Sequence, residues 1–249
     1  HVGGALDLRA RSSASGRTRG IYLNSAEIDL QHAISSGGRT RGNIVLQLFA
    51  EDPPDIHDGQ DIQIGEAYVL YQLPIHWDSE TTTFLKVGQF QVPFGLLAVY
   101  DPHLQIIQPL YSDSLGVRTD FGVALSGTLY GHLQYDASLT TGSGPNHADV
   151  DPNRLVTLRL GRTFDTRNGL VNFGGSLLSG RLPVTDLDAS DPFAVELPPS
   201  GRVRANRLDT SSERYTPKTR IAIDATYKYK SIMGRGEAVV GADRDHRGQ

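Results

Sequence analysis

The chain contains no cysteine, and that absence excludes several kinds of functional site. Without thiols there is no disulfide framework, no thiolate metal centre, no cysteine nucleophile and no covalent attachment site for a c-type haem. Long hydrophobic runs are missing as well. No segment approaches the roughly 18 consecutive apolar residues that a membrane-spanning helix requires.

A large excess of charge of one sign is also absent. The chain has 24 Lys and Arg residues against 28 Asp and Glu, a net charge of -4, and both signs are mixed along its length. A nucleic-acid-binding protein normally concentrates basic residues on one face, so no nucleic-acid partner is predicted. The mean hydropathy of -0.31 is typical of a soluble protein. A transmembrane β-barrel is equally polar overall, because its strands alternate polar and apolar residues.

Alternation with a period of two residues is the dominant pattern in the sequence. Around Arg159, for example, Leu158 and Leu160 fall on the opposite side of an extended chain. Many alternating segments are about ten residues long, which is the length that a tilted strand needs to cross a bilayer. The predicted fold class is all-β, an antiparallel transmembrane β-barrel. About eleven strands are predicted, near residues 2–11, 20–34, 43–51, 62–73, 82–90, 118–130, 132–141, 155–164, 170–179, 218–229 and 232–243.

The connections between these strands alternate in length. Short turns are predicted at 74–81, 130–132, 165–169 and 230–231, and long connections at 52–61, 91–117, 142–154 and 180–217. Outer-membrane barrels have short periplasmic turns and longer extracellular loops, whereas a soluble sandwich has no reason to sort its loops in this way. The sequence therefore predicts a single barrel domain with a long extracellular loop at 180–217.

Polar and charged residues opposite the apolar ones are predicted to line a water-filled lumen, because burying so many ionisable groups in a dry core would be too costly. The alternative is the solvent-facing side of a soluble antiparallel sheet. Both signs of charge occur, so the basic residues form either an anion track or half of a weakly selective, charge-balanced lining. The predicted pore-lining residues are Arg9, Arg11, Glu27, Asp29, Glu66, Lys86, Arg118, Asp120, Asp136, Arg159, Arg220, Asp224, Lys228, Arg235 and Glu237.

Motifs for catalysis or cofactor binding are not found. The sequence has no G-x-S-x-G nucleophile elbow and no phosphate-binding glycine loop between a strand and a helix. None of its eight His residues has the spacing of a metal ligand set. No enzyme activity, catalytic residue, metal site or cofactor is predicted.

The segment that follows the strand at 82–90 is rich in proline and apolar residues. It begins Val92-Pro93-Phe94-Gly95-Leu96 and is too apolar to extend freely into water. It is predicted either to pack as an extracellular lid or to fold inward and narrow the pore. The inward arrangement is favoured because a barrel lumen offers the buried surface that the segment needs, which makes 91–117 a candidate constriction loop.

At this segment the chain resembles the phosphate-selective porin O/P type of Gram-negative outer-membrane proteins. The resemblance rests on Lys86-Val87-Gly88-Gln89-Phe90-Gln91-Val92-Pro93-Phe94-Gly95-Leu96, with similar opening strands at 4–9 and 26–30 and a similar return strand at 115–118. It implies a sixteen-stranded, trimeric porin in the outer membrane that conducts small solutes passively. Phosphate selectivity is not implied, because 91–117 contains no Lys or Arg.

The C-terminal end differs from this family, whose barrels usually finish in a strand with a terminal aromatic residue. Residues 243–249 have no such ending. An antiparallel barrel also needs an even number of strands, because an unpaired edge inside lipid is untenable. The sequence is therefore predicted to be an N-terminal portion of a longer barrel that lacks the closing strands.

Three functional hypotheses follow. The first is an outer-membrane porin for passive diffusion of small hydrophilic solutes, with phosphate-like anions among the candidates and outer-membrane lipid around it. The second is a non-conducting outer-membrane barrel, either a scaffold or sheath for a partner protein or an adhesin that displays 180–217. The third is a soluble carbohydrate-binding β-protein, which would stay in solution without detergent.

Overall fold

The computed structural model describes residues 2–12, 19–51, 62–75, 80–96, 119–144, 152–183 and 215–243 of the chain. These residues form eleven strands, and none of them is α-helical. The predicted all-β class and strand number are therefore confirmed. The strands are β1 (Val2–Ser12), β2 (Arg19–Ser36), β3 (Arg39–Glu51), β4 (Ile62–Gln72), β5 (Thr82–Gln91), β6 (Thr119–Leu129), β7 (Leu133–Thr140), β8 (Leu155–Thr166), β9 (Gly169–Pro183), β10 (Tyr215–Tyr229) and β11 (Ile232–Asp243).

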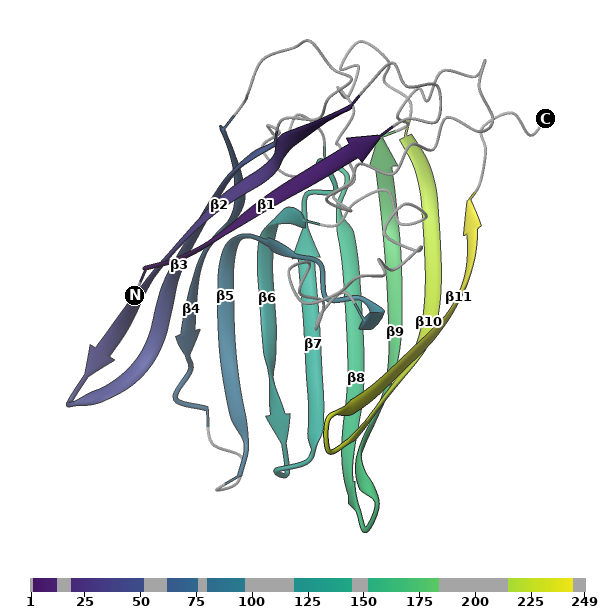
Figure 1. Ribbon diagram of the computed structural model, residues 1–249. Helices are drawn as coiled ribbons and strands as arrows, with labels where there is room; N and C mark the ends of the chain where they lie inside the picture. The colour runs from purple at the N-terminus through teal and green to yellow at the C-terminus, as the bar shows by residue number, and fades with distance from the viewer. Residues whose placement is uncertain are drawn as a thin grey trace.

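All eleven strands belong to one antiparallel sheet in which each strand pairs with its neighbours in sequence, from β1 through to β11. The sheet curves strongly and so has a concave and a convex face (Figure 1). Within the described residues β1 pairs only with β2 and β11 only with β10, so the sheet is not closed. Because the number of strands is odd, β1 and β11 run in the same direction. In the described part of the chain, no helix has the length and apolar character needed to span a bilayer.

The connections alternate in length as predicted from 37–38 onward, whereas 13–18 departs from this pattern. Connections of two to nine residues, at 37–38, 73–81, 130–132, 167–168 and 230–231, join strands at one end of the sheet. Those at the other end are 52–61, 92–118, 141–154 and 184–214, with ten or more residues each, and 13–18, with six. Gly37 and Gly38 have φ values of 59° and 73°, the positive values that a two-residue hairpin turn requires. The predicted long loop at 180–217 is shorter than expected, because β9 and β10 extend further and leave 184–214 between them.

The convex face carries continuous rows of exposed apolar side chains. Residues opposite each other in paired strands share a face, so the register identifies these rows directly. One row crosses β3 to β8, and its members are between 41% and 50% exposed. It consists of Ile44, Val69, Val87, Val123, Leu139 and Val156. A second row crosses β6 to β11 and consists of Leu125, Ala137, Leu158, Leu177, Ile221 and Val240.

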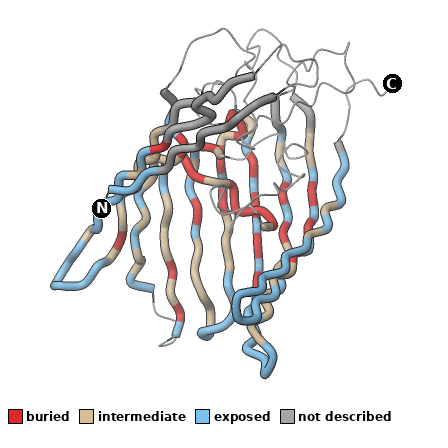
Figure 2. Tube along the Cα trace, viewed as in Figure 1, coloured by how far each residue is buried: buried red, intermediate tan, exposed pale blue. Residues whose placement is uncertain are grey.

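The concave face has the opposite character. Its central row, from β6 to β11, consists of Ser126, Asp136, Arg159, Ser176, Ala222 and Val239. Strand parity puts most of the buried strand residues on this face, and many of them are polar or charged. Residues 92–96 lie against it, inside the curve of the sheet (Figure 2). The sheet therefore exposes apolar side chains on its convex face and shelters polar ones on its concave face.

Candidate functional site

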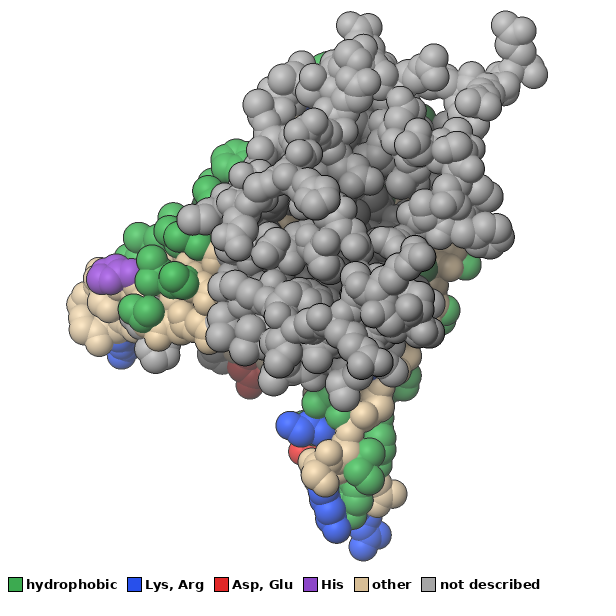
Figure 3. Space-filling model, turned by 45° about the horizontal axis from the view of Figure 1, so that its top comes forward, with side chains coloured by type: hydrophobic (Ala, Val, Ile, Leu, Met, Phe, Trp, Pro, Cys, Tyr) green, Lys and Arg blue, Asp and Glu red, His purple; other side chains and the backbone are tan. Residues whose placement is uncertain are grey.

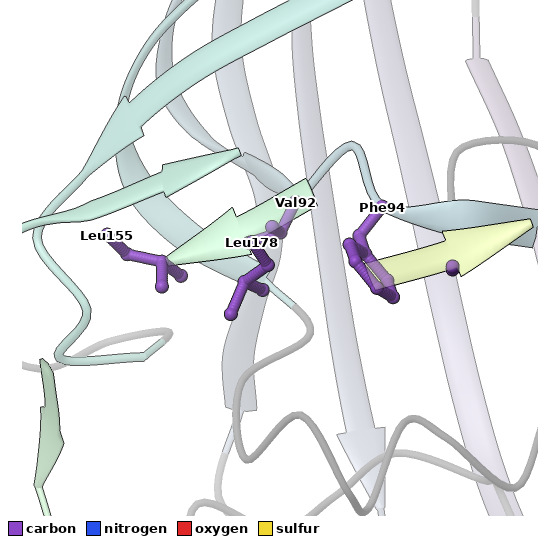
Figure 4. Packing of buried hydrophobic residues seen from close by; sticks show 5 residues of the cluster. Val92, Phe94, Leu155 and Leu178 are labelled. Carbon is purple, nitrogen blue, oxygen red and sulfur yellow. The ribbon is translucent and has the colours of Figure 1, made fainter. Parts of the chain in front are cut away.

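The first residues after β5 fold onto the concave face and dock on its far side. Val92 and Phe94 are fully buried and pack with Leu155, Leu178 and Ala222, which come from β8, β9 and β10 (Figure 4). We call Val92–Leu96 the inward segment. It runs from the end of β5 toward the inside of the curved sheet, which is the direction expected for a constriction loop. The remainder of the predicted loop, 97–117, lies outside the described residues.

Hydrogen bonds from three strands hold the inward segment in place. The Gly95 N–H donates to Ser176 Oγ at 2.9 Å, and Arg159 Nε donates to the Gly95 carbonyl at 3.1 Å. The Leu96 N–H donates to Glu237 Oε1 at 3.1 Å. These partners lie on β8, β9 and β11, so the segment connects the end of β5 with the opposite part of the sheet.

Glycine is required at position 95 of this segment. Its φ of 52° is a left-handed conformation that side chains disfavour. An added Cβ would also lie only 1.6 Å from Glu237 Oε1, which is the acceptor for the Leu96 N–H. A larger residue would therefore strain the backbone and displace the hydrogen-bonding partner of the next residue.

Arg159 forms a buried ion pair that anchors the same contact. Its Nη2 lies 2.7 Å from Asp224 Oδ1, and the two side chains are 4% and 0% exposed. Gly161 and Gly174 leave room for the pair. A Cβ would lie 3.0 Å from Arg159 Nη1 at Gly161, and 2.4 Å from Asp224 Oδ2 at Gly174. The ion pair with Asp224 therefore holds the Arg159 guanidinium where it donates to the Gly95 carbonyl.

Lys86 lies on the concave face of β5 between two aromatic rings. Its Nζ is 4.8 Å from the centre of the Tyr68 ring and 5.4 Å from that of Phe90, distances typical of cation–π contacts. Gly88 lies between Lys86 and Phe90 on this face, and its φ of 134° and the closeness of the β4 backbone leave no space for a side chain. Cation–π contacts with the Tyr68 and Phe90 rings thus hold the ammonium group, which forms no ion pair with the residues that the structure describes.

Asp120 has a structural role at the end of the sheet that carries the long connections. Its fully buried carboxylate accepts hydrogen bonds from the Phe121 N–H, Thr141 Oγ1, the Gly142 N–H and the Gly144 N–H, at 2.6–3.2 Å. These bonds fix the chain at 141–144 as it leaves β7. The carboxylate therefore holds the start of a connection.

Asp120→Ala is expected to destabilise the protein by about 3 kcal/mol, because four donors lose a charged acceptor and three of them belong to one turn. Denaturant unfolding followed by circular dichroism would measure this loss. Asp165→Ala is the matched control, because Asp165 is exposed near the 167–168 turn, and it should change stability by less than about 0.5 kcal/mol. Equal effects of the two variants would contradict the assigned role of Asp120.

The predicted pore-lining residues are sheltered to different extents. Strand parity puts the predicted lining residues that the structure describes on β5 to β11 on the concave face. On β2, Glu27 and Asp29 share one hydrogen-bond donor, because the Gln47 amide donates to Glu27 Oε1 at 2.6 Å and to Asp29 Oδ1 at 3.2 Å. Glu66 accepts a hydrogen bond from the Gln91 N–H at 3.2 Å. The side chains of Arg9 and Arg11, and all of Arg118, lie outside the described residues. Buried residues are Glu27, Asp120, Arg159, Arg220 and Asp224; half-buried ones are Asp29, Glu66, Lys86, Asp136 and Glu237; exposed ones are Lys228 and Arg235.

Several contributors to the site were not predicted from the sequence. Ser176 is one serine among many, and only the register that pairs it with Arg159 reveals its role. Gly161 and Gly174 carried a usable signal, because glycine inside a strand often marks a close approach of other atoms. Within the described residues, no group of three His, Asp or Glu side chains is arranged to hold a metal ion.

Comparison with known proteins identifies no relative: no family model, curated protein or solved structure matches the chain. The resemblance to the porin family therefore stays a prediction from the residues at 86–96.

Proposed function

We propose that this chain forms the wall of an outer-membrane diffusion pore, with lipid on the convex face and water on the concave face. The observation that supports the proposal is the distribution of side chains over the two faces. Apolar rows cover the outside of the sheet, while ionisable groups such as Arg159, Asp224 and Glu237 lie within its curve. A soluble protein would have the reverse arrangement.

The exposed apolar face is too extensive for a protein surrounded by water. The two rows described above cross β3 to β11 without a charged residue, and Ile223 and Val240 are 66% and 76% exposed. Contiguous apolar surfaces of more than a few hundred Å² are rare on soluble monomers and mark sites that contact a partner or a membrane. Hydrocarbon is the environment that would cover such a curved face evenly.

Aromatic and basic side chains gather near the short turns, as at the interface of a membrane. Phe164 and Phe173 pack edge to face on the convex side with ring centres 6.3 Å apart, and the Arg162 guanidinium lies 5.0 Å from the centre of the Phe164 ring. Lys230 lies 5.1 Å from the centre of the Tyr229 ring at the neighbouring hairpin. In Figure 3, hydrophobic side chains cover the flanks of the described strands, and Lys and Arg gather at hairpin ends. Such a belt is typical of outer-membrane barrels.

The inward segment would narrow this pore and would weaken its preference for anions. Because Arg159 is paired with Asp224 and bonded to the Gly95 carbonyl, its charge is compensated within the wall. This removes one member of the predicted anion track and favours a weakly selective pore for small hydrophilic solutes. Passage needs no catalytic group.

Reconstitution into planar lipid bilayers tests the proposal. The full-length protein should produce stepwise increases in ion conductance, and reversal potentials in a salt gradient should show modest selectivity. Absence of conductance from protein that has inserted would overturn the pore and favour a non-conducting scaffold. A protein that remains soluble and monomeric without detergent would overturn membrane insertion altogether.

A further inference from the structure

Two opposite charges in the middle of the concave face have no ion-pair partner among the described residues. Lys86 lies near the centre of β5, and its ammonium group lies over the rings of Tyr68 and Phe90. Asp136 lies near the centre of β7 and faces Arg159 in the register. The Arg159 guanidinium is directed instead to Asp224 and to the Gly95 carbonyl. Within the described residues, the Asp136 carboxylate therefore accepts no hydrogen bond.

Only β6 separates these two charges. It presents Ala124 opposite Lys86 and Ser126 opposite Asp136, so no long side chain from β6 comes between them. Two strand spacings across the sheet and an offset of two residues along it put the two backbones about 12 Å apart. Both residues are half-buried and both are carried by central strands. The concave face thus holds a fixed positive and a fixed negative charge side by side, separated by small residues.

We propose that Lys86 and Asp136 act together to select zwitterionic solutes, such as free amino acids, as they pass the inward segment. This inference rests on the proposed pore. A solute carboxylate is attracted toward Lys86 while its ammonium group is attracted toward Asp136. An anion or a cation of the same size is attracted by one of these charges and repelled by the other. A solute with both charges is therefore attracted by both residues, whereas a simple ion is attracted by one and repelled by the other.

Several other charges of the concave face do not offer this arrangement. Arg159 and Asp224 neutralise each other, and Asp120 is enclosed by hydrogen-bond donors. Lys228 and Arg235 are exposed but lie near the short turn at 230–231, with no described acid paired to either. They resemble a basic rim, which would act on all anions alike. Selection between zwitterions and neutral solutes is thus assigned to Lys86 and Asp136.

Liposome swelling with two isomeric solutes tests the proposal. Glycine and glycolamide contain the same atoms, but only glycine is a zwitterion at neutral pH. With the full-length protein in the membrane, glycine should enter about threefold faster than glycolamide. Lys86→Gln and Asp136→Asn should each reduce this ratio toward one without changing the glycolamide rate. Lys86→Arg and Asp136→Glu, which keep the charges, should preserve the ratio.

Arg162→Gln is the matched control, because it removes one positive charge from the convex face and should leave the ratio unchanged. Equal entry of both solutes into wild-type liposomes would overturn the selection of zwitterions and leave the pore intact. A ratio that survives both Lys86→Gln and Asp136→Asn would overturn the assignment to these residues. Failure of both solutes to enter would instead overturn the proposed pore itself.

Discussion

Arg159→Met is expected to release the inward segment and to destabilise the protein by about 3–5 kcal/mol, because the change leaves the Asp224 charge buried without its partner. The Gly95 carbonyl would lose its guanidinium donor in the same step. Two effects should therefore appear together. The midpoint of denaturant unfolding should fall, and the single-channel conductance should rise because the segment no longer narrows the lumen.

Asp224→Asn separates a structural role of this pair from a role in ion selection. If Arg159 attracts permeating anions, removing its charge should lower the conductance for anions, and Asp224→Asn should raise it. If the pair holds the inward segment, both variants should raise the conductance, since either one breaks the ion pair. Opposite changes in the two variants would contradict the anchoring role.

Arg162→Met provides the control on the same strand. Arg162 is exposed on the convex face, three residues after Arg159, and among the described residues its guanidinium contacts only the Phe164 ring. Its replacement should cost less than about 1 kcal/mol and should leave the conductance unchanged. A loss of stability as large as that of Arg159→Met would indicate that charge on β8, and not the buried pair, determines the effect.

The strands could be predicted from the sequence because each one has two chemically distinct faces. Leu158 and Leu160 alternate with Arg159, and a slip of one residue would reverse every side chain. The same constraint explains why the predicted concave charges on β7 to β11 share a face. The end of β9 could not be predicted in this way, because the strand continues to Pro183 through residues with little alternation.

The partners of these charges could not be predicted in the same way. Arg159 and Asp224 are 65 residues apart and lie on strands separated by β9, with an offset of two residues in the register. Only the paired register brings them together. The sequence predicted each as an independent lining residue, whereas the structure joins them in one buried pair. The same reason applies to Asp120, whose donors come mostly from the far end of β7.

The residues that carry the resemblance to porins now have physical roles. Lys86, Gly88 and Phe90 share the concave face, where the bare glycine lies between the cation and the ring. Gln89 points the other way, and its amide donates to the carbonyls of Ile64 and Gly65 at 2.7 and 3.1 Å beside the bulge of β4. The sequence predicted that the chain turns inward after Phe90. It could not predict the docking site, because that site is built from β8 to β11.

Leu158→Arg is the substitution that best separates a membrane-embedded sheet from a soluble one. Leu158 is 41% exposed and lies in the apolar row between Ala137 and Leu177. In a bilayer, an arginine in the middle of the lipid-facing surface is expected to cost about 2–4 kcal/mol. In water the same change would replace an exposed apolar group with a hydrated one and would cost almost nothing.

Unfolding of the protein in lipid vesicles, compared with the wild type, would measure the effect of Leu158→Arg. Gln134→Arg serves as the control, because Gln134 is exposed on the concave side of the neighbouring strand, where a lumen would hydrate the new charge. The proposed orientation requires a large loss of stability for Leu158→Arg and a small one for Gln134→Arg. The reverse order would mean that the concave face meets lipid, and two small effects would mean that neither face does. The sign of the difference thus determines which face of the curved sheet is in contact with the membrane.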